Sequence, residues 1–543
     1  MRLLRGPLRA ALFALPLLAL LPAAAQRPEE PLSALVAERE VHLDGRLGDP
    51  LWADAPVLDR FTQREPSEGA PATERTEVRV VVTPRTLVVG VVCFDREAGR
   101  ISARQYDRDG DFVSDDWVSI AVDSYLDRRN ASVFRVNPLG TQYDALVTNE
   151  GSQEETEWDA IWESRASVGP DGWRTEIAIP LSALRYPDGA TEFGFNVTRM
   201  LRRRQETSSW GAWRREAGPT RISMAGTLTG FRLERRLPLL IKPFLLTGYD
   251  RDVREAGGGY RTGGTFDAGL DAKVGVTPTL VLDATFRTDF AQVEADTQRV
   301  NLTRFPIFFP EKRDFFLERI GFTRFGQQEL GEVFYSRRIG LSADGEPVPI
   351  VGGARLTGNV GRTEVGVIAI RQDASAGLPE TDFYVARVRH PLGARSSFGA
   401  IFTDREGGPP GSEWNRAAGL DLDWKPTETL AFTAFWATTR DPQGKADTDG
   451  WRVSGQFDDG AWNAYSSLKR YDEDFDPGIG FVPRTGITNA FGRAGRRFYP
   501  AKGFVREWEV GGELDYFEDM EGDPVGREIR FELRAEGRDA SYL

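Results

Sequence analysis

The sequence predicts an all-β protein with two parts, an N-terminal β-sandwich and a C-terminal antiparallel β-barrel of the outer-membrane type. The first observation is composition: 57 glycines and an aromatic content of 11% are typical of turn-rich β structure. The second is a series of short β-branched runs separated by turn signals in the first half. The third is a strict alternation of apolar and polar residues through the second half.

The N-terminus predicts export. Arg2, Arg5 and Arg9 precede an apolar run that is too short to span a bilayer, and three alanines at 23–25 fit the small-residue rule for cleavage. We therefore expect a signal peptide over 1–25, with an uncleaved anchor as the alternative. Removal of three arginines and no acids changes the formal net charge from −13 to −16.

Composition also excludes several classes of protein. A single cysteine, Cys93, excludes an internal disulfide framework, and two distant histidines, His42 and His390, give poor support to a histidine-based zinc site or a Ser-His-Asp triad. Net acidity without a basic patch argues against a nucleic-acid partner. No window after residue 25 approaches the roughly 20 apolar residues of a membrane-spanning helix.

The first half is organised as a linker followed by a compact domain. Residues 26–35 are rich in Pro and Glu and are predicted to be a linker, and residues 36–234 are predicted to form the sandwich. The expected strands are 76–82, 86–95, 117–123, 131–136, 172–179 and 192–198, with one short helix near 180–184.

The second half, 235–543, is predicted to be the barrel. Even positions of 266–276 and 280–290 are apolar and are expected to face outward, whereas the odd positions carry most of the charges. About fifteen such strands follow one another. Tight turns are expected near 277, 360, 392, 426 and 459, and longer loops over 251–263, 405–415, 439–449 and 472–486. A soluble sandwich explains one or two such strands, but a membrane barrel explains the series.

Several segments carry a family resemblance. VHLDGRLGDPLW (41–52) and GWRTEIAIPLSALRY (172–186) resemble the family 9 carbohydrate-binding modules. DFAQVEADTQRVNLTRFPIFFPEKRDFFLE (289–318), with YSRRIG (335–340) and DPGIGF (476–481), resembles the large DUF5916-like domain to which such modules are fused in bacterial outer-membrane proteins. The resemblance implies a glycan-binding-like sandwich before an outer-membrane barrel. Because the chain stops at Leu543, just after an alternating segment, a truncated barrel is also expected.

Candidate carbohydrate-binding residues follow from the chemistry of sugars. Aromatic faces contact the apolar face of a pyranose, and charged or amide groups bond its hydroxyls. The candidates are Trp117, Trp158, Trp162, Trp210, Trp213 and Arg108. The resemblance implies a sugar held between two tryptophans but does not identify the pair, and structural tryptophans without a ligand are the alternative.

Two acidic regions have alternative interpretations. Asp107, Asp109 and Asp111 could supply oxygen ligands to calcium, but the EF-hand spacing fails at Phe112 and Val118, so turn formation and ion pairing with arginines are the alternative. Residues near 291–330 mix acids and bases and are predicted to form an inward loop or plug pinned by ion pairs, in preference to an acid/base site. We assign no catalytic residue and, apart from calcium, no cofactor.

These features favour an exported outer-membrane protein whose sandwich binds carbohydrate without cleaving it. One alternative is a glycoside hydrolase of carbohydrate catabolism, which hydrolyses O-glycosyl bonds and carries an appended binding module. A second alternative is a cell-surface scaffold that binds protein. The expected partners are a glycan or oligosaccharide and outer-membrane lipid.

Overall fold

The computed structural model describes residues 28–541 apart from 29, 152, 157, 185, 216–217, 219, 235–238, 254–259, 278, 288–304, 318, 328–329, 342–347, 375–378, 394, 409–410, 501 and 538–540. The predicted signal peptide, 1–25, lies outside the described residues. Strands dominate the described chain, and its two α-helices, α1 (Leu51–Asp54) and α2 (Asp314–Leu317), have four residues each. None of the helices in this part of the chain is long and apolar enough to cross a membrane.

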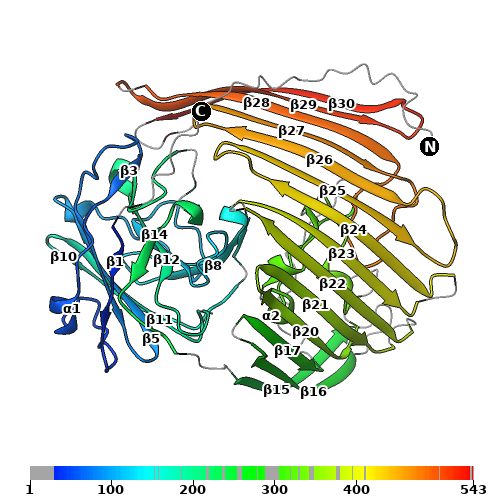
Figure 1. Ribbon diagram of the computed structural model, residues 1–543, viewed down its shortest axis with the longest axis horizontal. Coiled ribbons are helices and arrows are strands. Elements are labelled where there is room, and N and C mark those ends of the chain that lie inside the picture. Colours follow the sequence, from blue (N-terminus) through cyan, green and yellow to red (C-terminus); the bar gives the residue numbers. More distant parts are fainter. Residues whose placement is uncertain are drawn as a thin grey trace.

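The first half forms two packed sheets (Figure 1). The five-stranded sheet has the order β10-β11-β5-β4-β2, and the nine-stranded sheet has the order β1-β14-β12-β6-β7-β8-β9, with β13 beside β12 and β3 beside β13. The bounds are β1 Leu32–Ser33, β2 Leu35–Val36, β3 Thr62–Glu65, β4 Thr76–Val82, β5 Thr86–Phe94, β6 Trp117–Asp123, β7 Ala131–Val136, β8 Gln142–Thr148, β9 Gln153–Glu155, β10 Glu163–Gly169, β11 Gly172–Pro180, β12 Phe193–Leu201, β13 Glu206–Ser209 and β14 Gly226–Thr229.

The core of the sandwich lies between these sheets. Alternate residues of β4, β5 and β11 meet alternate residues of β6, β7 and β12, and among them Trp173, Phe134 and Phe195 are fully buried. The core cluster draws its residues from 32–233 alone. Burial of this much apolar surface from one continuous segment is what an independently folding domain requires.

Two local expectations differ from the structure. The predicted linker contributes β1, which pairs with β14, and the start of β2, which pairs with β4, so strands of both sheets begin inside 26–35. A strand of two residues is too short to show the alternation of apolar and polar residues by which a strand is predicted. The predicted short helix near 180–184 is a turn after Pro180, where β11 ends, and the short α-helix that does form, α1, lies between β2 and β3.

The second half forms one antiparallel sheet of 14 strands in sequence order, β15 to β30. The bounds are β15 Leu239–Val253, β16 Tyr260–Gly275, β17 Leu280–Phe286, β20 Ile350–Val360, β21 Thr363–Gln372, β22 Thr381–Leu392, β23 Ser396–Glu406, β24 Trp414–Trp424, β25 Leu430–Arg440, β26 Asp449–Asp458, β27 Trp462–Tyr471, β28 Ile487–Phe498, β29 Val505–Glu518 and β30 Pro524–Gly537; a small separate pair, β18 Gly326–Gln327 and β19 Gly331–Glu332, lies between β17 and β20. The sheet is curled, with β15 and β30 at the ends of its order (Figure 1). The predicted curled antiparallel sheet is confirmed.

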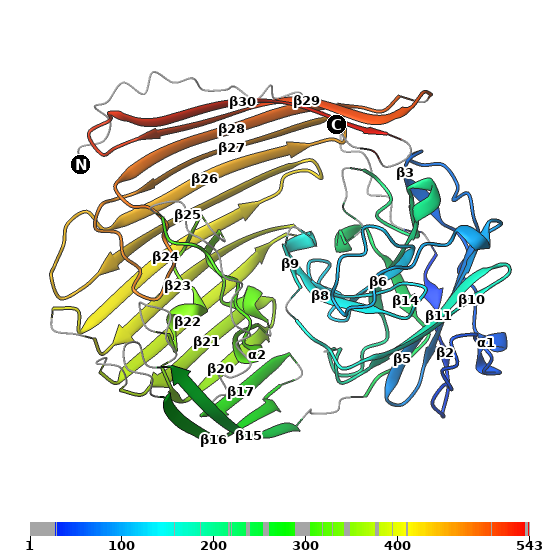
Figure 2. The ribbon, with the colours of Figure 1, turned by 180° about the vertical axis from the view of Figure 1, so that it is seen from behind.

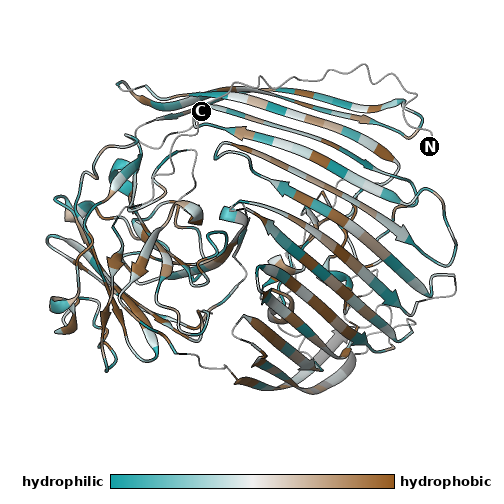
Figure 3. Ribbon diagram, in the orientation of Figure 1, coloured by the Kyte–Doolittle hydropathy of each residue, from teal (hydrophilic) through white to brown (hydrophobic). Residues whose placement is uncertain are grey.

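Hydropathy alternates along many strands of this sheet, as the coloured bands in Figure 3 show. Phe266, Leu270 and Val274 are exposed, whereas Val281, Asp283 and Thr285 are buried, so even positions of β16 and β17 face outward as predicted. The inner face carries ion pairs between strands, with Arg355 2.9 Å from Asp283 and Arg387 2.6 Å from Asp421. The outer face therefore exposes large apolar side chains, whereas the inner face carries ion pairs beside a buried apolar cluster.

The segment between β17 and β20 lies against the inner face (Figure 2). Phe316 and Phe325 join inward-facing residues of the sheet, such as Ile368 and Phe383, in one buried cluster. Part of the predicted plug, 291–304, 318 and 328–329, lies outside the described residues. The described remainder packs on the concave side of the sheet.

Candidate functional site

A small pocket lies on the outer face of the nine-stranded sheet. In β6, β7 and β12 the core-facing side chains alternate with outward ones, and these outward positions line the pocket. The lining residues are Trp117, Ser119, Ala121, Arg135, Asn196, Thr198 and Thr220. The space is about 260 Å³, open mouth included. Its enclosed part holds about one water molecule, so only a small polar group of a larger ligand would enter it.

Arg135 is the most unusual group in this pocket. Its guanidinium lies between two aromatic rings, with Cζ 4.7 Å from the ring centre of Trp117 and 4.5 Å from that of Tyr143. Its Nε is buried and has no hydrogen-bond partner within the described structure. Burial lowers the pKa of Arg135 from its ordinary value, against weaker opposing effects of Tyr143 and Glu154. Arg135 is half-buried, and the positive charge that it brings to the pocket favours an oxygen-rich ligand.

Two neighbouring polar groups already have partners. The Asn196 amide donates to Ser209 Oγ and to the Gly211 carbonyl at 3.2 and 3.1 Å, and its oxygen accepts the Gly211 N–H at 2.8 Å. Thr198 Oγ1 lies 3.0 Å from Ser209 Oγ. These bonds fix one wall of the pocket, where Arg135 supplies the charged group beside the hydroxyls of Ser119 and Thr220.

Of the predicted tryptophans, only Trp117 lines this pocket. Trp158 and Trp162 pack edge-on against Phe134, with ring centres 6.1 and 5.3 Å away, and Trp162 is buried in the core. Trp210 is also buried in the core. Their role in binding stays a prediction, but the structure places their rings against protein.

Trp213 lies apart from those three tryptophans. It is half-buried, and its ring stands over Gly69, where an added Cβ would lie 3.6 Å from the ring. The structure therefore does not bring Trp158, Trp162, Trp210 and Trp213 together on one exposed surface.

The guanidinium of Arg108 donates its hydrogen bonds to other groups of the protein. Its guanidinium donates to Asp144 at 2.6 Å, to Asp159 at 3.1 Å and to Asp109 at 3.2 Å, and also to Gln142 and the Ala160 carbonyl. Burial raises the pKa of Asp144 to about 6 despite these donors. Arg108 therefore fastens the segment around Ala160 to β8.

The predicted calcium ligands do not gather as a trio. Asp109 lies with Asp144 and Asp159, whose carboxylate oxygens are within 4.8 Å of one another, but Asp107 and Asp111 are not part of this group. Arg108 supplies a positive charge among the three grouped carboxylates. Asp144 and Asp159 escaped the sequence analysis because they are far along the chain from Asp109. Calcium binding stays a prediction.

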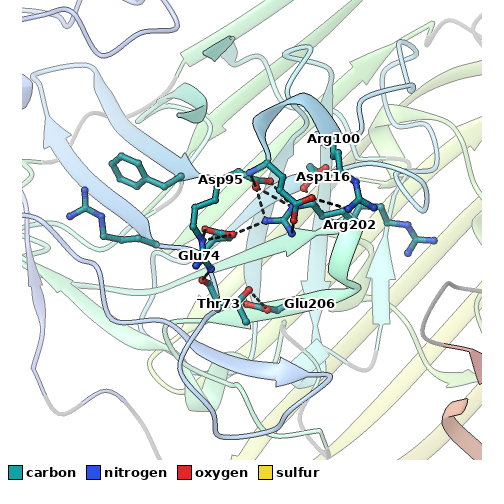
Figure 4. Close-up of polar contacts among 12 residues, drawn as sticks. Thr73, Glu74, Asp95, Arg100, Asp116, Arg202 and Glu206 are labelled. Carbon is teal, nitrogen blue, oxygen red and sulfur yellow. Dashed lines mark hydrogen bonds and ion pairs between the residues drawn. The ribbon is translucent and has the colours of Figure 1, made fainter. Parts of the chain in front are cut away.

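A second polar cluster joins the two sheets at one end of the sandwich (Figure 4). Arg203 lies 2.6 Å from Glu74 and 2.6 Å from Asp95, and it also pairs with Glu97 at 2.8 Å. Thr73 donates to Glu206 through both its backbone N–H and its hydroxyl. The carboxylates of this cluster have protein partners, so its role is to hold the sheets together.

The buried acid of the inner segment is also fully engaged. Glu311 accepts hydrogen bonds from Arg313 Nη2 at 2.6 Å and from Ser336 Oγ at 2.5 Å. Arg313 further donates to the carbonyls of Ile339 and Ser336. These bonds engage the carboxylate of Glu311 and leave it poorly suited to proton transfer, and the plug stays a prediction.

Sequence reasoning missed Arg135, Asn196 and Thr198. A usable signal exists at one of them, because Arg135 is the only charged residue in its strand, ASVFRV, and its neighbours Phe134 and Val136 face the core. A charge at an outward position between core positions marks a polar surface feature.

One region of the chain matches a known family model. The family described as "Domain of unknown function (DUF5916)" matches residues 236–356, the start of the 14-stranded sheet and the inner segment. A search of curated proteins returned no match.

Solved structures resemble the chain at low overall similarity. A family 9 carbohydrate-binding module from Caldicellulosiruptor kristjanssonii, in complex with cellotriose, has 18% identity and a TM-score of 0.25 and covers 38% of this chain and 94% of its own. A putative carbohydrate-binding protein from Bacteroides uniformis has 14% identity and a TM-score of 0.30 and covers 37% and 98%. Pseudomonas aeruginosa OccK3 has 10% identity and a TM-score of 0.28 and covers 78% and 95%.

Proposed function

We propose that the sandwich binds a saccharide without cleaving it and that the curled sheet anchors the chain in the outer membrane. The observation that carries the binding proposal is Arg135, a largely buried guanidinium with an unused Nε donor beside the ring of Trp117. Sugars offer acceptor oxygens and an apolar ring face, which suit this pair. The resemblance of 41–52 and 172–186 to family 9 modules supports the same chemistry.

The size and charge of the pocket favour an acidic sugar. The pocket accepts one substituent, and a carboxylate would satisfy the guanidinium with charge-assisted hydrogen bonds, which are about twice as strong as neutral ones. The pyranose ring would then lie at the mouth, beside Trp117. Micromolar to millimolar dissociation constants are expected, because the contact area is small and association is costly.

Calorimetry with neutral and uronic-acid oligosaccharides tests the binding. Arg135→Gln should weaken binding by about 10- to 100-fold, since a hydrogen bond to a charged group contributes roughly 1.5–3 kcal/mol. Arg165→Gln is the matched control, because Arg165 is exposed on β10 of the other sheet, and it should leave binding unchanged.

Three results would contradict this proposal. No heat with any saccharide would favour the scaffold, and equal binding by Arg135→Gln would place the site elsewhere. Release of reducing sugar by the full chain would favour the glycoside hydrolase.

The membrane proposal is supported by the two faces of the sheet. Large apolar side chains such as Leu420, Phe402 and Phe531 are exposed on the outer face, where lipid would cover them. Ion pairs lie on the opposite face, where their charges avoid lipid. The chain should fractionate with outer membranes and migrate differently in gels before and after heating; recovery in the soluble periplasm would contradict the proposal.

A further inference from the structure

The two ends of the 14-stranded sheet have different connections. At one end the connections 276–279, 361–362, 393–395, 425–429, 459–461 and 499–504 contain two to six residues each. At the other end 373–380, 407–413, 441–448, 472–486 and 519–523 contain five to fifteen. The first set is called the short-turn end below, and the second the long-loop end.

The sandwich contacts the short-turn end. Arg129 of the sandwich donates to the Ser396 carbonyl and to Ser397 Oγ, both at 3.3 Å, where β23 begins after the 393–395 turn. Arg221 lies 3.1 Å from the Glu428 carboxylate and donates to the Glu428 carbonyl at 2.7 Å, in the 425–429 turn. Two different turns therefore hold the sandwich.

Further contacts lie at the same end. Glu65 is 3.6 Å from Arg506 at the start of β29, and the Arg215 guanidinium lies 3.9 Å from the ring centre of Tyr499. The chain also enters β15 from the sandwich at this end, at Leu239. Both ribbon views show the sandwich beside the short-turn end, with long loops such as 441–448 and 472–486 at the opposite end of the strands (Figures 1 and 2).

The pocket lies close to these contacts. Thr220 lines it, and the next residue, Arg221, pairs with the 425–429 turn. The candidate saccharide site is thus held next to the short-turn end and not at a distance from the sheet.

In outer-membrane barrels the short turns face the periplasm and the longer loops face the outside. From this placement we infer that the sandwich lies on the periplasmic side of the outer membrane and that its ligand is a saccharide present in the periplasm. The inference rests on the proposed function, because the orientation rule holds only if the sheet is embedded in that membrane. A glycan outside the cell would reach the pocket only after crossing the membrane.

Cysteine accessibility in cells tests this inference. The one native cysteine, Cys93, is fully buried, so the full chain gives little background labelling. Three single substitutions report three places: Ala446→Cys in a long loop, Ala461→Cys in a short turn, and Val168→Cys on the exposed edge of the sandwich. Each is treated with a membrane-impermeant maleimide, on intact cells and after permeabilisation of the outer membrane.

The expected result separates the three positions. Ala446→Cys should be labelled on intact cells, whereas Ala461→Cys and Val168→Cys should gain at least tenfold in labelling only after permeabilisation. Labelling of Val168→Cys on intact cells would overturn the inference and leave the membrane anchor intact. Equal protection of Ala446→Cys and Val168→Cys, with the chain in the soluble periplasm, would instead overturn the proposed membrane anchor and this inference with it.

Discussion

Loss of the Arg203 guanidinium should strongly destabilise the sandwich. The Arg203 side chain is 5% exposed, and its partners Asp95 and Glu74 are 0% and 5% exposed. Removing one partner of a buried ion pair typically costs about 3–5 kcal/mol, because the remaining charge is left uncompensated. Asp95 keeps the Glu97 N–H at 2.8 Å and Glu74 keeps Arg96, so Arg203→Met should fall near the lower value, about 3 kcal/mol.

Urea unfolding of the segment 28–234, followed by tryptophan fluorescence, measures this loss. The urea concentration at the midpoint should fall. The dependence of the unfolding free energy on urea concentration should change little, because the substitution does not alter the surface exposed on unfolding. Glu97→Gln is the control: its side chain is 47% exposed, so the loss should stay below about 1 kcal/mol. Equal losses in Arg203→Met and Glu97→Gln would refute the reasoning that burial makes this cluster strong.

Three further predictions concern acid stability, the membrane face and a strained turn. Arg39 donates two hydrogen bonds to Asp49 and lowers the pKa of that carboxyl, so the contribution of Asp49 to stability is present above about pH 4 and lost as pH falls. Between pH 6 and pH 3 the urea midpoint should therefore fall more steeply for the wild type than for Asp49→Asn. Ser466 faces outward and its neighbour Ser467 inward. Ser466→Glu should therefore cost about 1–2 kcal/mol of folding free energy in lipid vesicles, and Ser467→Glu much less. Equal costs would contradict the assigned faces. Gly172 has φ +137° and an added Cβ would lie 2.0 Å from the Cys93 carbonyl, so Gly172→Ala should cost more than about 2 kcal/mol by the same urea assay, and a neutral effect would show that the turn relaxes freely.

The strands were predictable where one face is buried. The expected ranges 76–82, 117–123 and 131–136 coincide with β4, β6 and β7, because β-branched residues at alternate positions pack into one core. The outward face of β16 and β17 was predictable for the same reason, since a slip of one residue would turn Asp283 to the apolar outer face. In both the sandwich strands and the outward face of β16 and β17, the alternation of apolar and polar residues was sufficient for the prediction.

The site was harder to predict because three separated strands assemble it. Trp117, Arg135 and Asn196 are neighbours only through the pairing of β6 with β7 and with β12. The acidic residues around Trp158 and Trp162 suggested an exposed loop, but both rings pack on Phe134 and leave the charges to the surface. A tryptophan beside charged residues is therefore poor evidence of exposure, because its large ring gains most from burial.

The arginines of the sandwich differ in the partners of their N–H donors, and this difference distinguishes structural arginines from a candidate binding residue. Arg108 and Arg203 each donate to two buried or half-buried carboxylates, and each fastens two parts of the fold together. Arg135 is held between the rings of Trp117 and Tyr143, which stabilise its charge but leave its Nε donor unused. Cation–π contacts stabilise a desolvated guanidinium by about 2 kcal/mol but satisfy none of its N–H donors, whereas a carboxylate does both. This difference makes Arg135, and not the more heavily bonded arginines, the residue whose partner we expect to be the ligand.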